Sequence, residues 1–169
     1  MFYYYGYSEI RELILSKHHE YGAAVLACIA SLSLAKFPLH LQREISANLQ
    51  NYEAFKTGGV FKFNAVPLDD DARSGYSHTA ILARALKSEL IEPKFHCLRA
   101  QNRVKYTGQS LEFRLKHKRN FKILTPPQFP VILVDDIITS GLSMLQARES
   151  LMRGGFTPVC GLVLANAKE

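Results

Sequence analysis

The sequence predicts a single α/β domain built on a mainly parallel central sheet that is flanked by helices. Three observations predict this class. The chain has 169 residues, which suits one packed domain better than two. Apolar segments of strand length alternate with segments of helical periodicity from about residue 60 to residue 165. The run Val131–Val134 is apolar at every position, as in a parallel strand buried on both faces, so we expect it at the centre of the sheet.

The N-terminal part is predicted to be an aromatic strand followed by three helices. Phe2–Tyr5 is strand-like, and we expect its tyrosines in the core or at a sheet edge rather than stacked on nucleic-acid bases. A first helix should begin at Ser8, whose hydroxyl can cap it, and end near Lys17. A second helix is expected over about residues 21–36, and a third after Pro38.

The middle of the chain is predicted to alternate strand, helix and strand. Val60–Leu68 favours a strand, and an acidic loop follows over residues 69–75. Leucines recur at every fourth position from Leu82 to Leu90, which predicts a helix that Pro93 ends. Lys94–Arg99 is then the next expected strand. The basic stretch after it is expected to hold a short helix or flap that uses Leu111, Phe113 and Leu115.

The C-terminal part is predicted to complete a strand–helix–strand unit. After the apolar run and two aspartates, a turn over Ile137–Leu142 leads into a helix. That helix should stop at Gly154-Gly155, where glycine can adopt a left-handed conformation, and a strand follows over Pro158–Ala165. The apolar face predicted for the helix consists of Met144, Ala147, Leu151 and Met152.

The positive charge of the chain is concentrated in one segment. The formal net charge is +6, but Lys94–Lys122 alone contains nine basic residues and one acid, a net charge of +8. Such a block is either a solvated face or a surface for an anionic partner such as phosphate or nucleic acid. The residues we assign to a nucleic-acid surface are Arg99, Arg103, Lys105, Arg114, Lys116, Lys118 and Arg119.

The remaining composition points to a reducing compartment and gives no sign of a membrane span. Three separated cysteines, Cys28, Cys97 and Cys160, form neither a disulfide framework nor a zinc pattern, so we expect reduced core thiols. The longest uncharged stretch, Tyr21–Ala35, falls short of the roughly 20 apolar residues that span a bilayer. We expect no targeting segment and a cytoplasmic location, with association with the inner face of the membrane left open.

The stretch VILVDDIITSGLS, residues 131–143, predicts an anion site next to two carboxylates. Unpaired backbone N–H groups at a helix start attract anions, glycine lets the backbone close on a phosphate, and hydroxyls add donors. Carboxylates repel phosphate, so the aspartates would bind sugar hydroxyls or a bridging cation. Together these groups predict a site for a phosphorylated sugar, against the alternative that they only cap a helix.

This stretch resembles the phosphoribosyl pyrophosphate loop of type I phosphoribosyltransferases: a hydrophobic strand, two acids, two spacers, Thr-Thr or Thr-Ser, Gly, a spacer, then Thr or Ser. Within that class, residues 61–165 resemble the ComF family of competence proteins. The positions that carry this second resemblance are Ser74-Gly75-Tyr76-Ser77-His78, Leu98-Arg99-Ala100, Thr107, Gln109, Leu111, Arg114 and Asn120.

The resemblance implies a single phosphoribosyltransferase-like domain over residues 1–169. It implies that Thr139, Ser140, Gly141 and Ser143 bind the 5-phosphate of phosphoribosyl pyrophosphate. Asp135 and Asp136 would bind the ribose hydroxyls, with magnesium carried by the ligand rather than held by protein ligands alone. The loop that would hold the pyrophosphate contains Arg73, Ser74 and Gly75, but it begins with three aspartates that repel pyrophosphate unless magnesium intervenes. The cysteine-rich zinc module with which family members commonly begin is not found in this sequence.

Two functions therefore follow from the sequence, and a third, weaker interpretation is a sensor that binds phosphoribosyl pyrophosphate without turnover. The first is a phosphoribosyltransferase-fold competence protein that binds phosphoribosyl pyrophosphate with magnesium and handles single-stranded DNA in natural transformation, with proteins of the DNA-uptake machinery as further partners. The alternative is an active phosphoribosyltransferase that acts on a nucleobase or amine in nucleotide metabolism, with the basic segment as a flap. No general base for an acceptor is identified, and His78 either faces the same crevice or is a structural or solvated histidine.

Overall fold

The computed structural model describes residues 1–48, 62–68, 75–102, 104 and 109–168. The helices are α1 Tyr7–Leu15, η1 Ser16–His18, α2 Gly22–Leu32, η2 Leu34–Lys36, α3 Phe37–Asn48, α4 His78–Ala85, α5 Leu111–Lys116 and α6 Leu142–Arg153, where η marks a single 3₁₀ turn. The strands are β1 Tyr5–Gly6, β2 Phe63–Pro67, β3 Ile91–Pro93, β4 Leu98–Ala100, β5 Phe121–Ile123, β6 Val131–Ile138 and β7 Pro158–Asn166.

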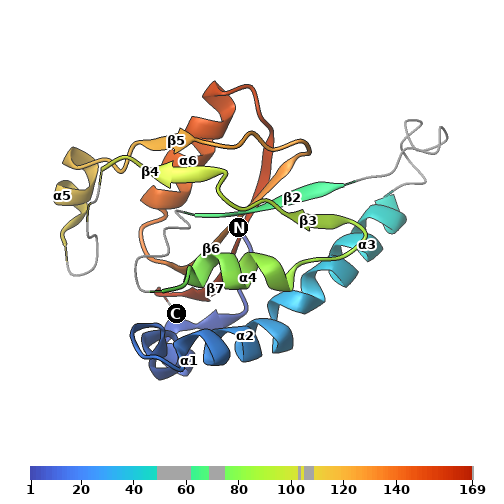
Figure 1. The fold of residues 1–169 in the computed structure, drawn as a ribbon, viewed down its shortest axis with the longest axis horizontal. Coiled ribbons are helices and arrows are strands. Elements are labelled where there is room, and N and C mark those ends of the chain that lie inside the picture. The colour runs from blue at the N-terminus through green and yellow to red at the C-terminus, as the bar shows by residue number, and fades with distance from the viewer. Residues whose placement is uncertain (49–61, 69–74, 103, 105–108, 169) are drawn as a thin grey trace.

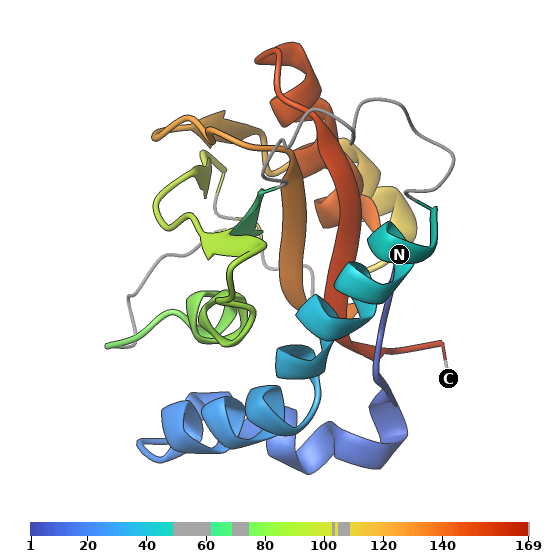
Figure 2. The same ribbon diagram turned by 90° about the vertical axis from the view of Figure 1, so that its right-hand side faces the viewer.

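Five strands form one parallel sheet in the order β1-β7-β6-β2-β3, and β4 and β5 form a separate antiparallel ribbon. The expected α/β fold with a parallel central sheet is therefore confirmed. The apolar run Val131–Val134 begins β6, which lies in the middle of the sheet as predicted (Figure 1). In Figure 2, β6 and β7 run side by side through the centre of the molecule.

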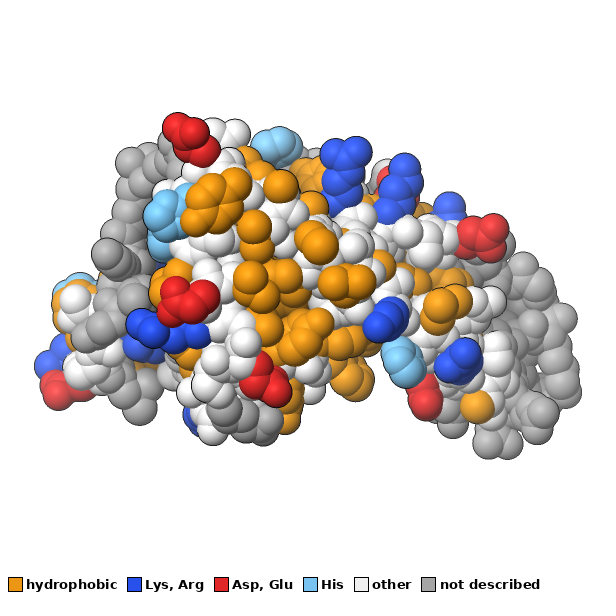
Figure 3. All heavy atoms as spheres, turned by 90° about the horizontal axis from the view of Figure 1, so that it is seen from below, with side chains coloured by type: hydrophobic (Ala, Val, Ile, Leu, Met, Phe, Trp, Pro, Cys, Tyr) orange, Lys and Arg blue, Asp and Glu red, His pale blue; other side chains and the backbone are white. Residues whose placement is uncertain are grey.

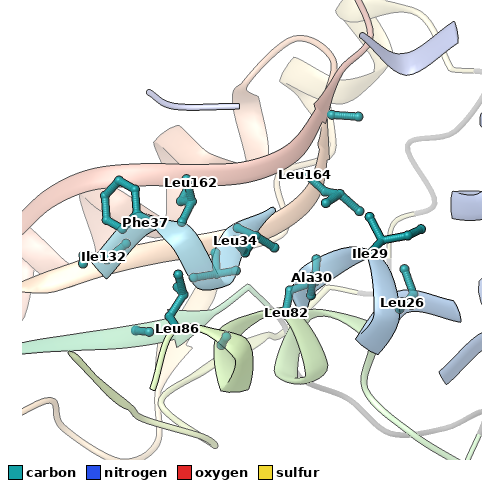
Figure 4. Packing of buried hydrophobic residues seen from close by; sticks show 14 of the residues in the cluster. Leu26, Ile29, Ala30, Leu34, Phe37, Leu82, Leu86, Ile132, Leu162 and Leu164 are labelled. Atoms are coloured by element: carbon teal, nitrogen blue, oxygen red, sulfur yellow. The ribbon is translucent and has the colours of Figure 1, made fainter. Parts of the chain in front are cut away.

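The sheet carries a hydrophobic core on each face, because side chains of one strand alternate between the two faces. Ile132 and Val134 of β6 pack with residues of α1, α2 and α4 on one face (Figure 4). Val131 and Leu133 pack on the other face with α6 and the β4–β5 ribbon. In Figure 1, α1, α2 and α4 lie below the sheet, and α6, β4 and β5 lie above it.

The structure corrects the first predicted helix at its start. The N-cap of α1 is Gly6 rather than Ser8, and the Glu9 carboxylate accepts a hydrogen bond from the Gly6 N–H at 2.6 Å. A carboxylate in the first turn can therefore satisfy a free amide there without a hydroxyl. The prediction that the N-terminal tyrosines lie in the core or at a sheet edge is confirmed for Tyr5, which lies in the edge strand β1.

The helix predicted to continue to Leu90 is shorter than its leucine spacing suggested. It ends at Ala85, and Pro93 lies in strand β3 instead of ending a helix. β3 is an edge strand, where the missing N–H of proline is tolerated. The strand predicted over Lys94–Arg99 is found only at its end: β3 lies before it, and β4 begins at Leu98 and includes its last two residues.

The predictions for the C-terminal part agree with the structure except for Met152, and the prediction for the cysteines holds only in part. The helix α6, the left-handed Gly155 and the strand β7 are found as expected, but Met152 is exposed instead of facing the core. All three cysteines are free thiols, as expected, yet only Cys97 is buried, while Cys28 is exposed and Cys160 is half-buried. The short helix expected in the basic stretch is confirmed as α5.

The helical run Gly22–Ala47 is long and apolar enough to cross a membrane by length and composition alone. A helix in a protein core passes the same test, and Leu26, Ile29 and Ala30 of this run are buried against the sheet. Figure 3 shows hydrophobic side chains gathered on the face of the molecule seen from below, the side on which α1 and α2 lie in Figure 1. The large exposed hydrophobic residues on α1, α2, α3 and the turn before α2 are Leu13, Tyr21, Leu32 and Leu39.

Candidate functional site

The two aspartates of the predicted site lie inside β6, because this strand continues past them to Ile138. Adjacent strand residues project to opposite faces of a sheet. Asp136 accordingly contacts Lys17 and His78 on the face of α1, α2 and α4. Asp135 is instead within range of the positive charge of Arg119, which comes shortly before β5 in the chain. The structure thus brings the carboxylates to one edge of the sheet but gives each a different set of neighbours.

Asp136 is the centre of a buried charged cluster. Its Oδ2 accepts a hydrogen bond from Lys17 Nζ at 2.5 Å and lies 3.7 Å from His78 Nε2, and its Oδ1 accepts the N–H of Ile137 at 2.8 Å. Burial acts to raise the pKa of the Asp136 carboxyl, but attraction to Lys17 and His78 outweighs burial and holds this pKa below its ordinary value. Asp136 is therefore a carboxylate at neutral pH.

Asp135 has the opposite electrostatic environment. Burial of its carboxyl, and then repulsion from Asp136, raise the pKa of Asp135 well above its ordinary value. The Asp136 N–H donates to Asp135 Oδ1 at 2.9 Å, and this bond and the charge of Arg119 oppose the shift without reversing it. Because burial and repulsion disfavour the negative charge of Asp135, a bound cation or hydroxyl donor would stabilise this carboxylate.

The residues after β6 form an open turn into α6. Thr139 and Ser140 are exposed, and Ser143 is half-buried in the first turn of the helix. Gly141 is the N-cap with φ of +77°, a left-handed conformation that favours glycine, and no side chain caps the helix there. The first amides of α6 have no partner within the helix, so they and the two hydroxyls can meet an anion.

Arg114 links the basic segment to this turn. Its Nη1 donates to Thr139 Oγ1 at 2.9 Å and makes a longer contact to Ser140 Oγ at 3.5 Å, and its Nε donates to the carbonyl of Gln109 at 3.1 Å. Ser110 caps α5 by accepting the N–H of Phe113. The residue predicted as part of a nucleic-acid surface therefore places a guanidinium on the hydroxyls of the predicted phosphate turn.

The other predicted basic residues are distributed over the β4–β5 ribbon and α5. Arg99 of β4 lies directly opposite Lys122 of β5, and both are exposed. Lys118 is exposed, Arg119 is half-buried, and Lys116 pairs with Glu112 at 2.7 Å. Arg103 and Lys105 lie outside the described residues, as do Arg73 and Ser74 of the predicted pyrophosphate loop. Gly75 of that loop is exposed with φ of +89°.

Lys17 is the site residue that the sequence analysis missed. It lies 119 positions before Asp136 in the chain, in a turn whose sequence shows no functional motif. His78, for which the sequence left two roles open, lies beside Asp136 at the start of α4. Within the ranges described, no group of three or more His, Cys, Asp or Glu side chains could hold a metal ion. No protein-family model matches the chain, and no curated protein matches it either.

Proposed function

We propose that this protein has a type I phosphoribosyltransferase-like fold and binds phosphoribosyl pyrophosphate at the carboxyl edge of β6. The observation that carries the proposal is the turn after β6, where Arg114 donates to Thr139 beside the uncapped N-terminus of α6. Guanidinium groups, hydroxyls and free amides together bind a phosphate. The carboxylates Asp135 and Asp136 next to this turn suit the ribose hydroxyls of such a ligand.

Magnesium fits this site as a cation carried by the ligand. Mg²⁺ prefers oxygen ligands and usually keeps water and phosphate oxygens around it, with one or two protein carboxylates. Asp135 fits that role because its neighbour Asp136 repels its negative charge, whereas Asp136 is already held by Lys17. When bound, the cation would neutralise part of the charge of the pyrophosphate group.

We expect phosphoribosyl pyrophosphate with magnesium to bind with a measurable heat and to raise the melting temperature, because a ligand selective for the native state stabilises it. Thr139→Ala and Asp136→Ala should each weaken the affinity about tenfold, since each removes a hydrogen bond to a ligand group. Arg148→Ala, an exposed charge further along α6, is the matched control and should leave the affinity unchanged.

Isothermal titration calorimetry distinguishes the outcomes. Absence of binding at millimolar ligand, or equal affinity for all three variants and the wild type, would contradict the site assignment. Release of pyrophosphate after addition of a nucleobase or amine would favour the alternative function, an active phosphoribosyltransferase.

We further propose that the basic segment binds single-stranded DNA in natural transformation, as a ComF-type competence protein would. The support is the pair Arg99 and Lys122, two like charges placed directly opposite each other on an exposed ribbon. Like charges opposite each other are unfavourable in a ribbon unless an anion lies over them. Phosphates of a nucleic-acid strand are anions of that kind, and their neutralisation makes binding salt-dependent.

We expect Arg99→Ala/Lys122→Ala to weaken binding of single-stranded DNA and to lower the slope of log affinity against log salt by about 1.4, at about 0.7 per lost phosphate contact. Thermal stability should not fall, because exposed charges contribute little to folding. Lys36→Ala/Arg43→Ala, which removes two exposed charges from η2 and α3, is the control. Fluorescence anisotropy at several salt concentrations measures both, and an unchanged slope in the ribbon variant would assign this segment to a solvated face.

A further inference from the structure

Lys17, Asp136 and His78 form a layered cluster at the carboxyl edge of the sheet. They come from three elements: η1, β6 and α4. The side chain of Asp136 is 9% exposed, whereas that of Lys17 is 19% exposed and that of His78 is 37% exposed. The carboxylate therefore lies underneath, and the two nitrogen-bearing side chains lie between it and solvent.

The Lys17 side of the cluster presents donors to a ligand that approaches it. Each carboxylate oxygen of Asp136 accepts one hydrogen bond, one from Lys17 and one from the backbone of Ile137, and keeps a second lone pair that suits a ribose hydroxyl. An ammonium group has three N–H donors, and the bond to Asp136 uses one of them. The groups left for a ligand at Lys17 are therefore donors on a positive nitrogen, which suit an anion.

The position of Lys17 is held by its neighbours. The hydroxyl of Tyr76 donates to the backbone carbonyl of Lys17 at 2.8 Å. Gly22, at the start of α2, lies so close that a Cβ there would collide with the Ser16 carbonyl and the Tyr76 hydroxyl. These contacts hold the backbone of η1, and the bond to Asp136 holds the ammonium group, so both are in place before a ligand arrives.

The cluster and the phosphate turn both lie next to the two aspartates: Lys17 and His78 contact Asp136, and the turn begins where β6 ends. Thr139 follows Asp136 by three residues, which can span at most about 11 Å. Arg114 and the turn supply one group of anion-binding donors, and the Lys17 ammonium group, with His78 beside the same carboxylate, supplies another. A ribose with a phosphate at one end and a diphosphate at the other matches two such groups with carboxylates between them.

We infer that Lys17, with His78 beside it, binds the diphosphate group of phosphoribosyl pyrophosphate. This inference rests on the proposed function and adds to it the residue that distinguishes the diphosphate ligand from a sugar with a single phosphate. It also names a positive charge for the diphosphate, which the three aspartates at residues 69–71 would repel. The positive charge comes from Lys17, in the N-terminal part of the chain.

The test compares two ligands, phosphoribosyl pyrophosphate and ribose 5-phosphate, by calorimetry at a fixed magnesium concentration. Lys17→Met should lose about tenfold or more in affinity for the first ligand, because a charged hydrogen bond is lost. Its affinity for ribose 5-phosphate should change less than twofold, and Lys17→Arg should recover part of the loss. Lys36→Met, an exposed lysine of η2, is the control and should resemble the wild type for both ligands.

A second variant keeps the buried ion pair intact. His78→Gln leaves Lys17 and Asp136 in place and should still bind phosphoribosyl pyrophosphate several-fold more weakly, with ribose 5-phosphate unaffected. Equal losses for the two ligands in both variants, or no loss in either, would overturn the role of Lys17 and leave the proposed function standing. If the wild type binds neither ligand, the proposed function fails and this inference fails with it.

Discussion

Asp136→Asn should lower the free energy of unfolding by about 2 to 3 kcal/mol at neutral pH, whereas Asp135→Asn should raise it. Removing one partner of a fully buried ion pair costs about 3 to 5 kcal/mol, and the 19% exposure of the Lys17 side chain reduces that cost. At Asp135 the neutral amide removes the burial and repulsion that raise the pKa of this carboxyl, and its oxygen can still accept the Asp136 N–H. Two isosteric changes at adjacent positions therefore act in opposite directions.

The two effects should also depend on pH in opposite ways. A lowered pKa means that Asp136 adds stability above its ordinary pKa, and that this stability is lost as pH falls through the native value. A raised pKa means that Asp135 reduces stability as pH rises from its ordinary pKa through the native value. Asp135→Asn should therefore approach the wild type once the pH falls below the ordinary carboxyl pKa, whereas Asp136→Asn should do so only at a still lower pH, below the lowered native pKa of Asp136.

Urea unfolding at pH 7 and pH 3 measures these differences, and the variant Lys17→Met/Asp136→Asn completes a double-mutant cycle. Because this variant leaves no unpaired buried charge, it should be more stable than Asp136→Asn alone. Equal effects of the two asparagine variants at pH 7 would contradict the placement of the carboxyls on opposite faces. A gain in stability for Asp135→Asn would fit a carboxyl kept for binding at a cost to folding.

Leu26→Ala should destabilise the protein by about 2 to 5 kcal/mol, the cost of a cavity in a packed core. Leu26 is fully buried in α2 and packs in the cluster shown in Figure 4. Leu32 is the matched control, since it lies in the same helix and is 60% exposed. Leu32→Ala should change the free energy of unfolding by less than about 0.5 kcal/mol.

Urea unfolding followed by circular dichroism compares the two leucine variants. A large difference would support the packing of one side of α2 on the sheet, which also positions η1 and Lys17 beside Asp136. Similar effects of the two substitutions would mean that Leu26 does not anchor this helix in the protein core. The apolar side of the run Gly22–Ala47 would then have to be buried elsewhere, against a partner or in a membrane.

Local patterns in the sequence determined the parallel sheet, the central strand and the helix after the two aspartates. These features depend on short-range physics: an all-apolar run suits a strand covered on both sides, and glycines favour the turns that bound α6. The same patterns misplaced the end of α4, because the spacing of Leu82, Leu86 and Leu90 fits a helix whether or not the chain turns into an edge strand at Ile91.

The contacts of the candidate site depended on the tertiary structure. The opposite faces of Asp135 and Asp136 follow from the alternation of strand side chains, but only once β6 is known to continue to Ile138. The pairing of Lys17 with Asp136 and of Arg114 with Thr139 joins residues 119 and 25 positions apart, and periodicity carries no information over such separations. The position of η1 beside β6 and the reach of the Arg114 side chain to the turn decide which charges meet there, because a charge interacts with whatever lies within a few ångströms, however distant in the chain.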